Sequence, residues 1–115
     1  MKIAIVMDPI SNIDFKKDST LLLIYEAQKR NHDVFYIESN NLFFDGKDAC
    51  ALSSIIKVKM DPKSWFSLDE EKKIILKDLD VIFMRQDPPF DMGYINNTYV
   101  LESAENDGVR IYNKP

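Results

Sequence analysis

The chain has 115 residues, of which 45% are hydrophobic and 30% are charged, and its formal net charge at pH 7 is −4. This length suits one compact domain whose core needs no disulfide or metal to stabilise it. The acidic balance argues against nucleic acid as a partner, because proteins that bind the phosphate backbone present basic surfaces. No apolar run approaches the roughly 18 residues that a membrane-spanning helix requires, so no membrane segment is predicted.

Cysteine, histidine and glycine usage restricts the chemistry that the chain can carry. The only cysteine, Cys50, can form no intramolecular disulfide, which is typical of a protein of the reducing cytoplasm. Cys50 stands between two alanines, so we expect a small packing residue rather than a nucleophile. The only histidine, His32, belongs to no cluster of metal ligands, and the three glycines are too far apart for a phosphate-binding loop. The residues themselves therefore predict no catalytic group and no cofactor site.

The amino-terminal part predicts a strand, a loop, a helix and a second strand. An apolar run at residues 3–7 is typical of a parallel strand that is covered on both faces. The helix is expected from residue 18 or 19 to about residue 30, and Asn31 can adopt the left-handed conformation that closes a helix. The second strand is expected at residues 34–37. The expected apolar stripe of the helix consists of Leu21, Leu22, Ile24, Tyr25 and Ala27.

The middle of the chain predicts an excursion of β structure. Asp45-Gly46 follows an apolar stretch and suits the tight turn of a β-hairpin, with a positive φ at Gly46. The strand that follows is expected within residues 49–60. There Ile56, Val58 and Met60 alternate with lysines, which is the pattern of a strand with one exposed face.

Residues 65–76 allow two interpretations. Ser67 and Glu70 have the spacing of a capping box, which would begin a short helix. Apolar residues on either side of a polar turn, at residues 65–66 and 74–76, would equally form a second hairpin. The residue pattern alone favours neither.

The last third returns to alternating strands and helices. Residues 81–84 predict a buried strand, residues 92–106 a helix that Gly108 ends, and residues 109–112 a final strand. The fold class is therefore expected to be α/β, with a small, doubly wound, mainly parallel sheet and an inserted β-hairpin excursion. The core-facing side of the second helix is expected to contain Ile95, Tyr99 and Val100.

Two polar segments follow strands of the predicted parallel sheet. In such sheets, ligands bind outside the carboxyl ends of the strands. Arg85 comes directly after a buried strand, and its planar guanidinium can hold a carboxylate with two hydrogen bonds. The alternative is that Arg85 pairs with Asp87 or Asp91 and only stiffens a loop that contains two prolines. The candidate substrate-binding residues at these strand ends are Asp8, Ser11, Asn12, Arg85 and Asp87.

The sequence RQDPPFD at residues 85–91 ends a longer stretch, residues 78–91, that resembles bacterial glutathione synthetase. The family commonly has a lysine where this chain has Gln86, so the chain lacks that positive charge. Shorter stretches that resemble the family lie at residues 5–9, 16–19, 26–30, 98–102 and 113–115.

This resemblance implies an amino-terminal, pre-ATP-grasp domain with a Rossmann-like fold, which precedes the catalytic ATP-grasp domain. The family's cytoplasmic ligases join γ-glutamylcysteine and glycine to give glutathione, using ATP and Mg²⁺. The groups that bind ATP and Mg²⁺ lie beyond residue 115 in the family, so the fragment alone is expected to be inactive. Its implied roles are to form a wall of the peptide-substrate site and to contact the rest of its own chain and other subunits. The resemblance also favours the hairpin for residues 65–76.

Two other functions stay open when only the residues are considered. A phosphoacceptor receiver domain has this size and an aspartate after its first strand, here Asp8, but Asp8 has no acidic neighbour. A stand-alone binding or interaction module would contain the same domain without an attached ligase. Self-labelling by a phosphoryl donor would identify a receiver domain.

Overall fold

The computed structural model of the protein describes residues 1–7, 9, 19–59, 66–85 and 92–113. Outside residues 65–76, the strands and helices in these ranges confirm the predicted ones to within two residues at each end. In chain order the elements are β1 (Lys2–Met7), α1 (Ser19–Lys29), β2 (Asp33–Glu38), the 3-10 turn η2 (Ser39–Asn41), β3 (Leu42–Asp45), β4 (Asp48–Val58), β5 (Phe66–Leu68), β6 (Lys72–Ile75), the 3-10 turn η3 (Leu76–Asp78), β7 (Val81–Arg85), α2 (Met92–Asn106) and β8 (Arg110–Asn113).

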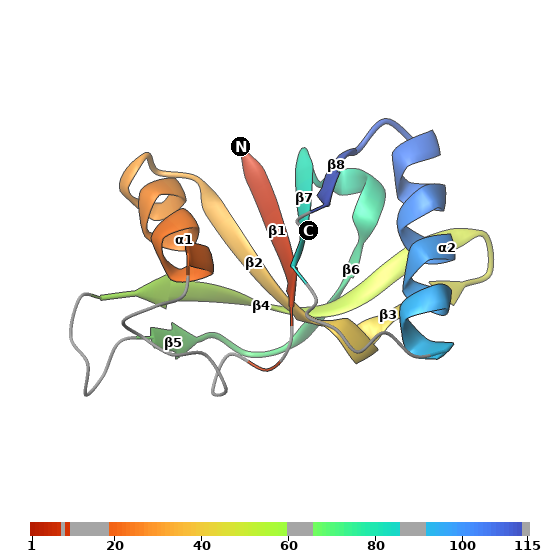
Figure 1. Cartoon of the computed structure of the whole chain (residues 1–115), viewed down its shortest axis with the longest axis horizontal. Coiled ribbons are helices and arrows are strands. Elements are labelled where there is room, and N and C mark those ends of the chain that lie inside the picture. The colour runs from red at the N-terminus through yellow and green to blue at the C-terminus, as the bar shows by residue number, and fades with distance from the viewer. Residues whose placement is uncertain (8, 10–18, 60–65, 86–91, 114–115) are drawn as a thin grey trace.

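Four strands form the parallel part of the sheet, in the order β2-β1-β7-β8. Helix α1 lies between β1 and β2 in the chain, and α2 lies between β7 and β8. Figure 1 shows the two helices on opposite sides of these strands. The predicted α/β fold, with a doubly wound and mainly parallel sheet, is therefore confirmed.

The side chains of β1 explain why both faces of the sheet are covered. Successive side chains of a strand point to opposite faces, and five of the six residues of β1 are buried. Its odd-numbered residues, from Ile3 on, pack in one cluster with Leu21 of α1. Ala4 and Val6 pack in a second cluster with Val100 of α2. A continuous apolar strand thus supplies two cores, and each fully buried Ile or Val contributes about 1.5–3 kcal/mol.

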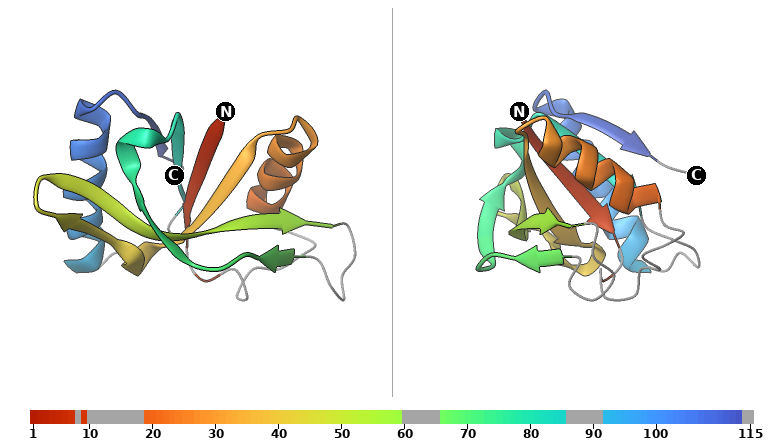
Figure 2. Two further views of the ribbon diagram at one scale, coloured as in Figure 1. Left: turned by 180° about the vertical axis from the view of Figure 1, so that it is seen from behind. Right: turned by 90° about the vertical axis from the view of Figure 1, so that its left-hand side faces the viewer.

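Strand β4 joins the parallel sheet to the β excursion. It has 11 residues and pairs with β2 in the antiparallel sense at Phe35 and Ile55. Cys50 and Ala51 pair both with β3 and with β6, so these two strands flank β4 on its two edges. Figures 1 and 2 show β4 running from its turn beside α2 to its other end near α1. The excursion therefore extends the parallel sheet and is not a separate unit.

The segment after β4 differs from both predictions for residues 65–76. It contains two short strands, β5 and β6, but these pair with β4 and not with each other. Leu68 pairs with Ile56, and Lys72 pairs with Ser53. The segment therefore advances four residues where β4 advances three. The extra residue is a β-bulge, which bends the segment without reversing it. The predicted hairpin is therefore wrong, because the long edge of β4 is the pairing partner of both strands.

The hairpin between β3 and β4 confirms the prediction at Gly46. Asp45 pairs with Asp48, so Gly46 and Lys47 are the two turn residues. Gly46 has a φ of 62°, and Lys47 is not among the residues with positive φ. Glycine at the first turn position is typical of a type II′ hairpin. Asp45 is therefore the last paired residue of β3 and not a turn residue.

Both helices end in a left-handed residue, as predicted. Asn31 has a φ of 65°, and its N–H donates to the Gln28 carbonyl at 3.0 Å. The His32 N–H donates to the Ala27 carbonyl at 3.1 Å, which completes a Schellman motif. Gly108 ends α2 in the same way, with a φ of 103°. These ends fix the direction in which β2 and β8 leave the helices.

Two residues of the predicted helix faces are exposed instead. Leu22 is 55% exposed and Tyr99 is 62% exposed, because neither lies on the stripe that faces the sheet. In α1 the buried positions recur every three residues, at Leu21, Ile24 and Ala27. In α2 they follow the i, i+3, i+4, i+7 spacing of an amphipathic helix. That stripe consists of Asn97, Val100, Leu101 and Ala104. Neither described helix is long and apolar enough to cross a membrane.

Candidate functional site

Of the five predicted site residues, the structure describes one, Arg85. Asp8, Ser11, Asn12 and Asp87 lie outside the described residues, as do Gln86 and Asp91, the latter being one of the alternative partners of Arg85. The described part of the predicted site therefore consists of the carboxyl ends of the strands.

Arg85 is the last residue of β7 and lies at the carboxyl edge of the parallel sheet. It pairs with Met7, the last residue of β1. The alternation along β7 puts Ile82 and Met84 in the core under α2, so Arg85 lies on the opposite face, with Phe83. The residue is half-buried, and its Nε atom is buried. This geometry agrees with the predicted position of Arg85 at a strand end.

A carboxylate that the sequence reasoning missed lies in the same row as Arg85. Glu38, the last residue of β2, pairs with Met7 from the other side, so the row reads Glu38, Met7, Arg85. Val34 and Tyr36 of β2 pack on the α1 face, and the alternation puts Glu38 on that face too. Neighbouring strands are about 4.8 Å apart, so the backbones of Glu38 and Arg85 are about 10 Å apart. A cation and an anion thus flank Met7 at one edge of the sheet.

The end of β2 is held by a buried polar contact from α2. Asn97 is 3% exposed, and its Nδ2 donates to the carbonyl oxygen of Ser39, the residue that follows Glu38. Glu38 itself is still extended, with φ −72° and ψ 145°, and its side chain makes no capping hydrogen bond to η2. The backbone is therefore fixed where Glu38 projects, while its carboxylate does not serve the turn.

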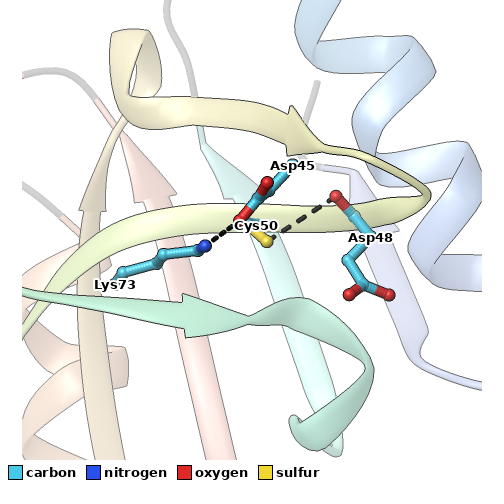
Figure 3. A network of polar contacts seen from close by, with 4 residues as sticks. All are labelled: Asp45, Asp48, Cys50 and Lys73. Atoms are coloured by element: carbon cyan, nitrogen blue, oxygen red, sulfur yellow. Dashed lines mark hydrogen bonds and ion pairs between the residues drawn. The ribbon is translucent and has the colours of Figure 1, made fainter.

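A second cluster of polar residues, Asp45, Asp48 and Lys73, lies around Cys50 in the β excursion (Figure 3). Lys73 Nζ donates to the carboxylate of Asp45, which raises the pKa of Lys73. Cys50 is fully buried, and its thiol donates to the Asp48 carbonyl at 3.6 Å. Burial raises the pKa of Cys50, and the nearby charge of Lys73 only partly opposes this. The thiol stays protonated at neutral pH, which agrees with the predicted packing role.

A cavity of about 390 Å³ lies on the opposite face of β7 from Arg85. It is bounded by α2, with Met84 and Ile111 as its floor, and Glu102 and Glu105 line it from the helix. Among the residues that the structure describes, no three His, Cys, Asp or Glu side chains gather as they would around a metal ion. The part of the chain that the structure describes therefore offers no cluster of ligands for Mg²⁺.

Comparison with known proteins gives consistent matches over the whole chain. The glutathione synthetases of Wigglesworthia glossinidia brevipalpis and Pseudomonas putida are each 48% identical to it over 115 residues. That of Vibrio cholerae is 45% identical over the same length. Each alignment covers 100% of this chain and 36% of the relative, so the chain spans about a third of the length of these proteins.

The family comparison agrees with these relatives. The prokaryotic glutathione synthetase N-terminal domain matches residues 1–115, which confirms the resemblance seen in the sequence. The match leaves no support for a receiver domain. The chain belongs to the family of prokaryotic glutathione synthetase N-terminal domains.

Proposed function

We propose that this domain forms one wall of the peptide-substrate site in a glutathione synthetase. In that reaction, ATP phosphorylates a carboxylate of γ-glutamylcysteine, and glycine attacks the acyl phosphate to give glutathione. The relatives that carry this name are nearly three times as long as the chain. The proposed contribution of residues 1–115 is to hold the dipeptide, as a single pre-ATP-grasp domain of a cytoplasmic enzyme.

The position of Arg85 is the observation that carries this proposal. Open α/β sheets bind ligands outside the carboxyl ends of their strands, and Arg85 is at such an end beside Met7. A guanidinium forms two parallel hydrogen bonds with a carboxylate, which sets the orientation of the ligand as well as its affinity. We assign to Arg85 the binding of a carboxylate of γ-glutamylcysteine, with Asp8, Ser11, Asn12 and Asp87 as further candidate contacts.

ATP and Mg²⁺ belong to the rest of the enzyme in this proposal. The described residues offer no cluster of metal ligands. When bound elsewhere in the longer protein, the nucleotide and its metal would supply the phosphoryl group and neutralise its charge. The domain itself would contact the ATP-grasp part of its own chain and contribute to contacts between subunits.

Replacement of Arg85 in the full-length enzyme tests the proposal. Removing one partner of a partly buried charged pair costs roughly 2–5 kcal/mol. Arg85→Ala is therefore expected to raise the KM for γ-glutamylcysteine well over tenfold, whereas the KM for ATP should change little. Arg85→Lys should restore binding only in part, because an ammonium group lacks the two-pronged geometry. Steady-state kinetics with each substrate varied in turn measure both constants.

A bracing role for Arg85 gives a different result. If Arg85 only stiffens the loop that follows β7, Arg85→Ala lowers the melting temperature and leaves the KM for the dipeptide unchanged. Melting curves recorded beside the kinetics separate the two roles, and an unchanged KM would remove Arg85 from the substrate site.

A further inference from the structure

We propose that Glu38 is a second substrate-binding residue, which holds the α-ammonium group of the γ-glutamyl moiety while Arg85 holds a carboxylate. This inference rests on the proposed function and names the chemical group that the site selects. Its basis is the row of Glu38, Met7 and Arg85 across the carboxyl edge of three neighbouring parallel strands.

The spacing of this row fits the zwitterionic end of an amino acid. Side chains that leave neighbouring strands on the same face begin about 4.8 Å apart per strand, so the side chains of Glu38 and Arg85 begin about 10 Å apart. The ammonium nitrogen and carboxylate carbon of an α-amino acid are about 2.5 Å apart. Two charge-assisted hydrogen bonds of about 2.8 Å, one at each end, and the C–O bond at the carboxylate extend this span to about 9 Å. A free amino-acid head group therefore has the length needed to bridge the two charged side chains.

The surroundings of the row favour such a ligand. Met7 lies between the two charged residues in the row and is 3% exposed, because it packs in the apolar cluster with α1, so both charges border an apolar region. Glu38 is half-buried, which strengthens its interaction with a cation relative to a fully solvated carboxylate. The contact between Asn97 and the Ser39 carbonyl fixes the backbone beside Glu38, so the carboxylate is presented from a defined position.

The role of Glu38 predicts how the enzyme discriminates between two substrates. Glutarylcysteine has the carbon chain and both terminal carboxylates of γ-glutamylcysteine, but a hydrogen in place of the α-ammonium group. For the wild-type full-length enzyme, kcat/KM should therefore be at least tenfold higher for γ-glutamylcysteine than for glutarylcysteine. Glu38→Gln should lower kcat/KM for γ-glutamylcysteine at least tenfold and leave that for glutarylcysteine unchanged. Glu38→Asp, which keeps the charge but shortens the side chain, should fall between wild type and Glu38→Gln.

A matched control lies at the other end of the same strand. Asp33 is exposed at the amino end of β2, so Asp33→Asn removes the same charge far from the row and should change neither substrate's constants. Melting temperatures of all variants show whether the fold is kept. If Glu38→Gln lowers kcat/KM equally for both substrates, or for neither, the inference is wrong. If Arg85→Ala still raises the KM for the dipeptide in that case, only the role of Glu38 is contradicted and the proposed function stands. A wild-type full-length enzyme that makes no glutathione would contradict the proposed function itself.

Discussion

Gly46 has a φ of 62° at the first position of the turn between β3 and β4. A Cβ atom built there meets nothing within 4 Å, so a side chain at this position is opposed by the backbone conformation alone. Gly46→Val should lower the free energy of unfolding by about 1–3 kcal/mol, because β-branched residues resist positive φ. Gly46→Asn should lose much less, since asparagine tolerates this region. Urea denaturation measures both, and equal midpoints for wild type and Gly46→Val would contradict the turn assignment.

The buried thiol of Cys50 links stability to alkaline pH. Its pKa is raised in the folded protein, chiefly by burial, above the usual value of about 8.5. As the pH rises past that value, the unfolded chain loses the proton first, so ionisation of the thiol favours unfolding. Wild type should therefore lose stability more steeply than Cys50→Ala as the pH rises above about 8.5.

The control for this prediction is the pH profile near neutrality. At pH 6–7.5 the thiol of the wild type is protonated in both the folded and the unfolded state, and Cys50→Ala has no thiol. The free energies of unfolding of the two proteins should therefore differ by a constant amount in this range, set by the loss of the sulfur atom. Urea unfolding across the series gives the two profiles. Parallel profiles up to pH 10.5 would show that the Cys50 thiol ionises equally in both states.

Single residues with special backbone geometry were predictable, whereas Glu38 was not. Asn31 and Gly46 have positive φ, and asparagine and glycine are residue types that adopt this conformation readily. Arg85 could be placed at a strand end because the apolar run before it defines the strand. Glu38 looks like any acidic residue at the end of a strand, and its relation to Arg85 exists only through the register of β2, β1 and β7.

At the scale of elements, Asn97 fixes α2 to the turn after β2. Its Nδ2 donates to the Ser39 carbonyl in a buried environment. Asn97→Leu keeps a similar volume but leaves that carbonyl without its donor, so it should cost about 1–3 kcal/mol of stability. Tyr99→Leu, two residues along the same helix at a 62% exposed position, should stay within about 0.5 kcal/mol of wild type. Urea denaturation of both variants decides, and equal losses would mean that α2 is not held through Asn97.

The local sequence pattern predicted some elements of the fold and failed for others. Strands and helices with a strong apolar period were predicted nearly to their ends. Residues 65–76 were not, because a short apolar stretch does not carry the identity of its partner strand. Both β5 and β6 pair with β4, and the sequence separation of the partners grows from 8 residues, for Val58 and Phe66, to 25 residues, for Cys50 and Ile75. Leu22 was assigned to the core for a similar reason, since hydrophobicity alone does not say which side of a helix faces the sheet.

The whole molecule combines two cores that share one strand. Both clusters depend on β1, so loss of either should disrupt the other, and the 115-residue chain is expected to unfold in one cooperative transition. The same chain is expected to form no glutathione from γ-glutamylcysteine, glycine and ATP, because in the proposed function the groups that bind ATP and Mg²⁺ belong to the rest of the enzyme. Circular dichroism in urea and a product assay measure the two properties. ATP-dependent product formation by the purified chain would overturn this expectation.

Strand β4 has a consequence for how the domain opens. Cys50 and Ala51 are fully buried and have paired strands on both edges, so no local fraying can expose their backbone. Strand β8, by contrast, is the last strand at its end of the sheet order. Amide hydrogens in the middle of β4 therefore exchange with solvent only when the entire domain unfolds, and their exchange rate reports its global stability. Those of β8 exchange through smaller openings at the edge of the sheet.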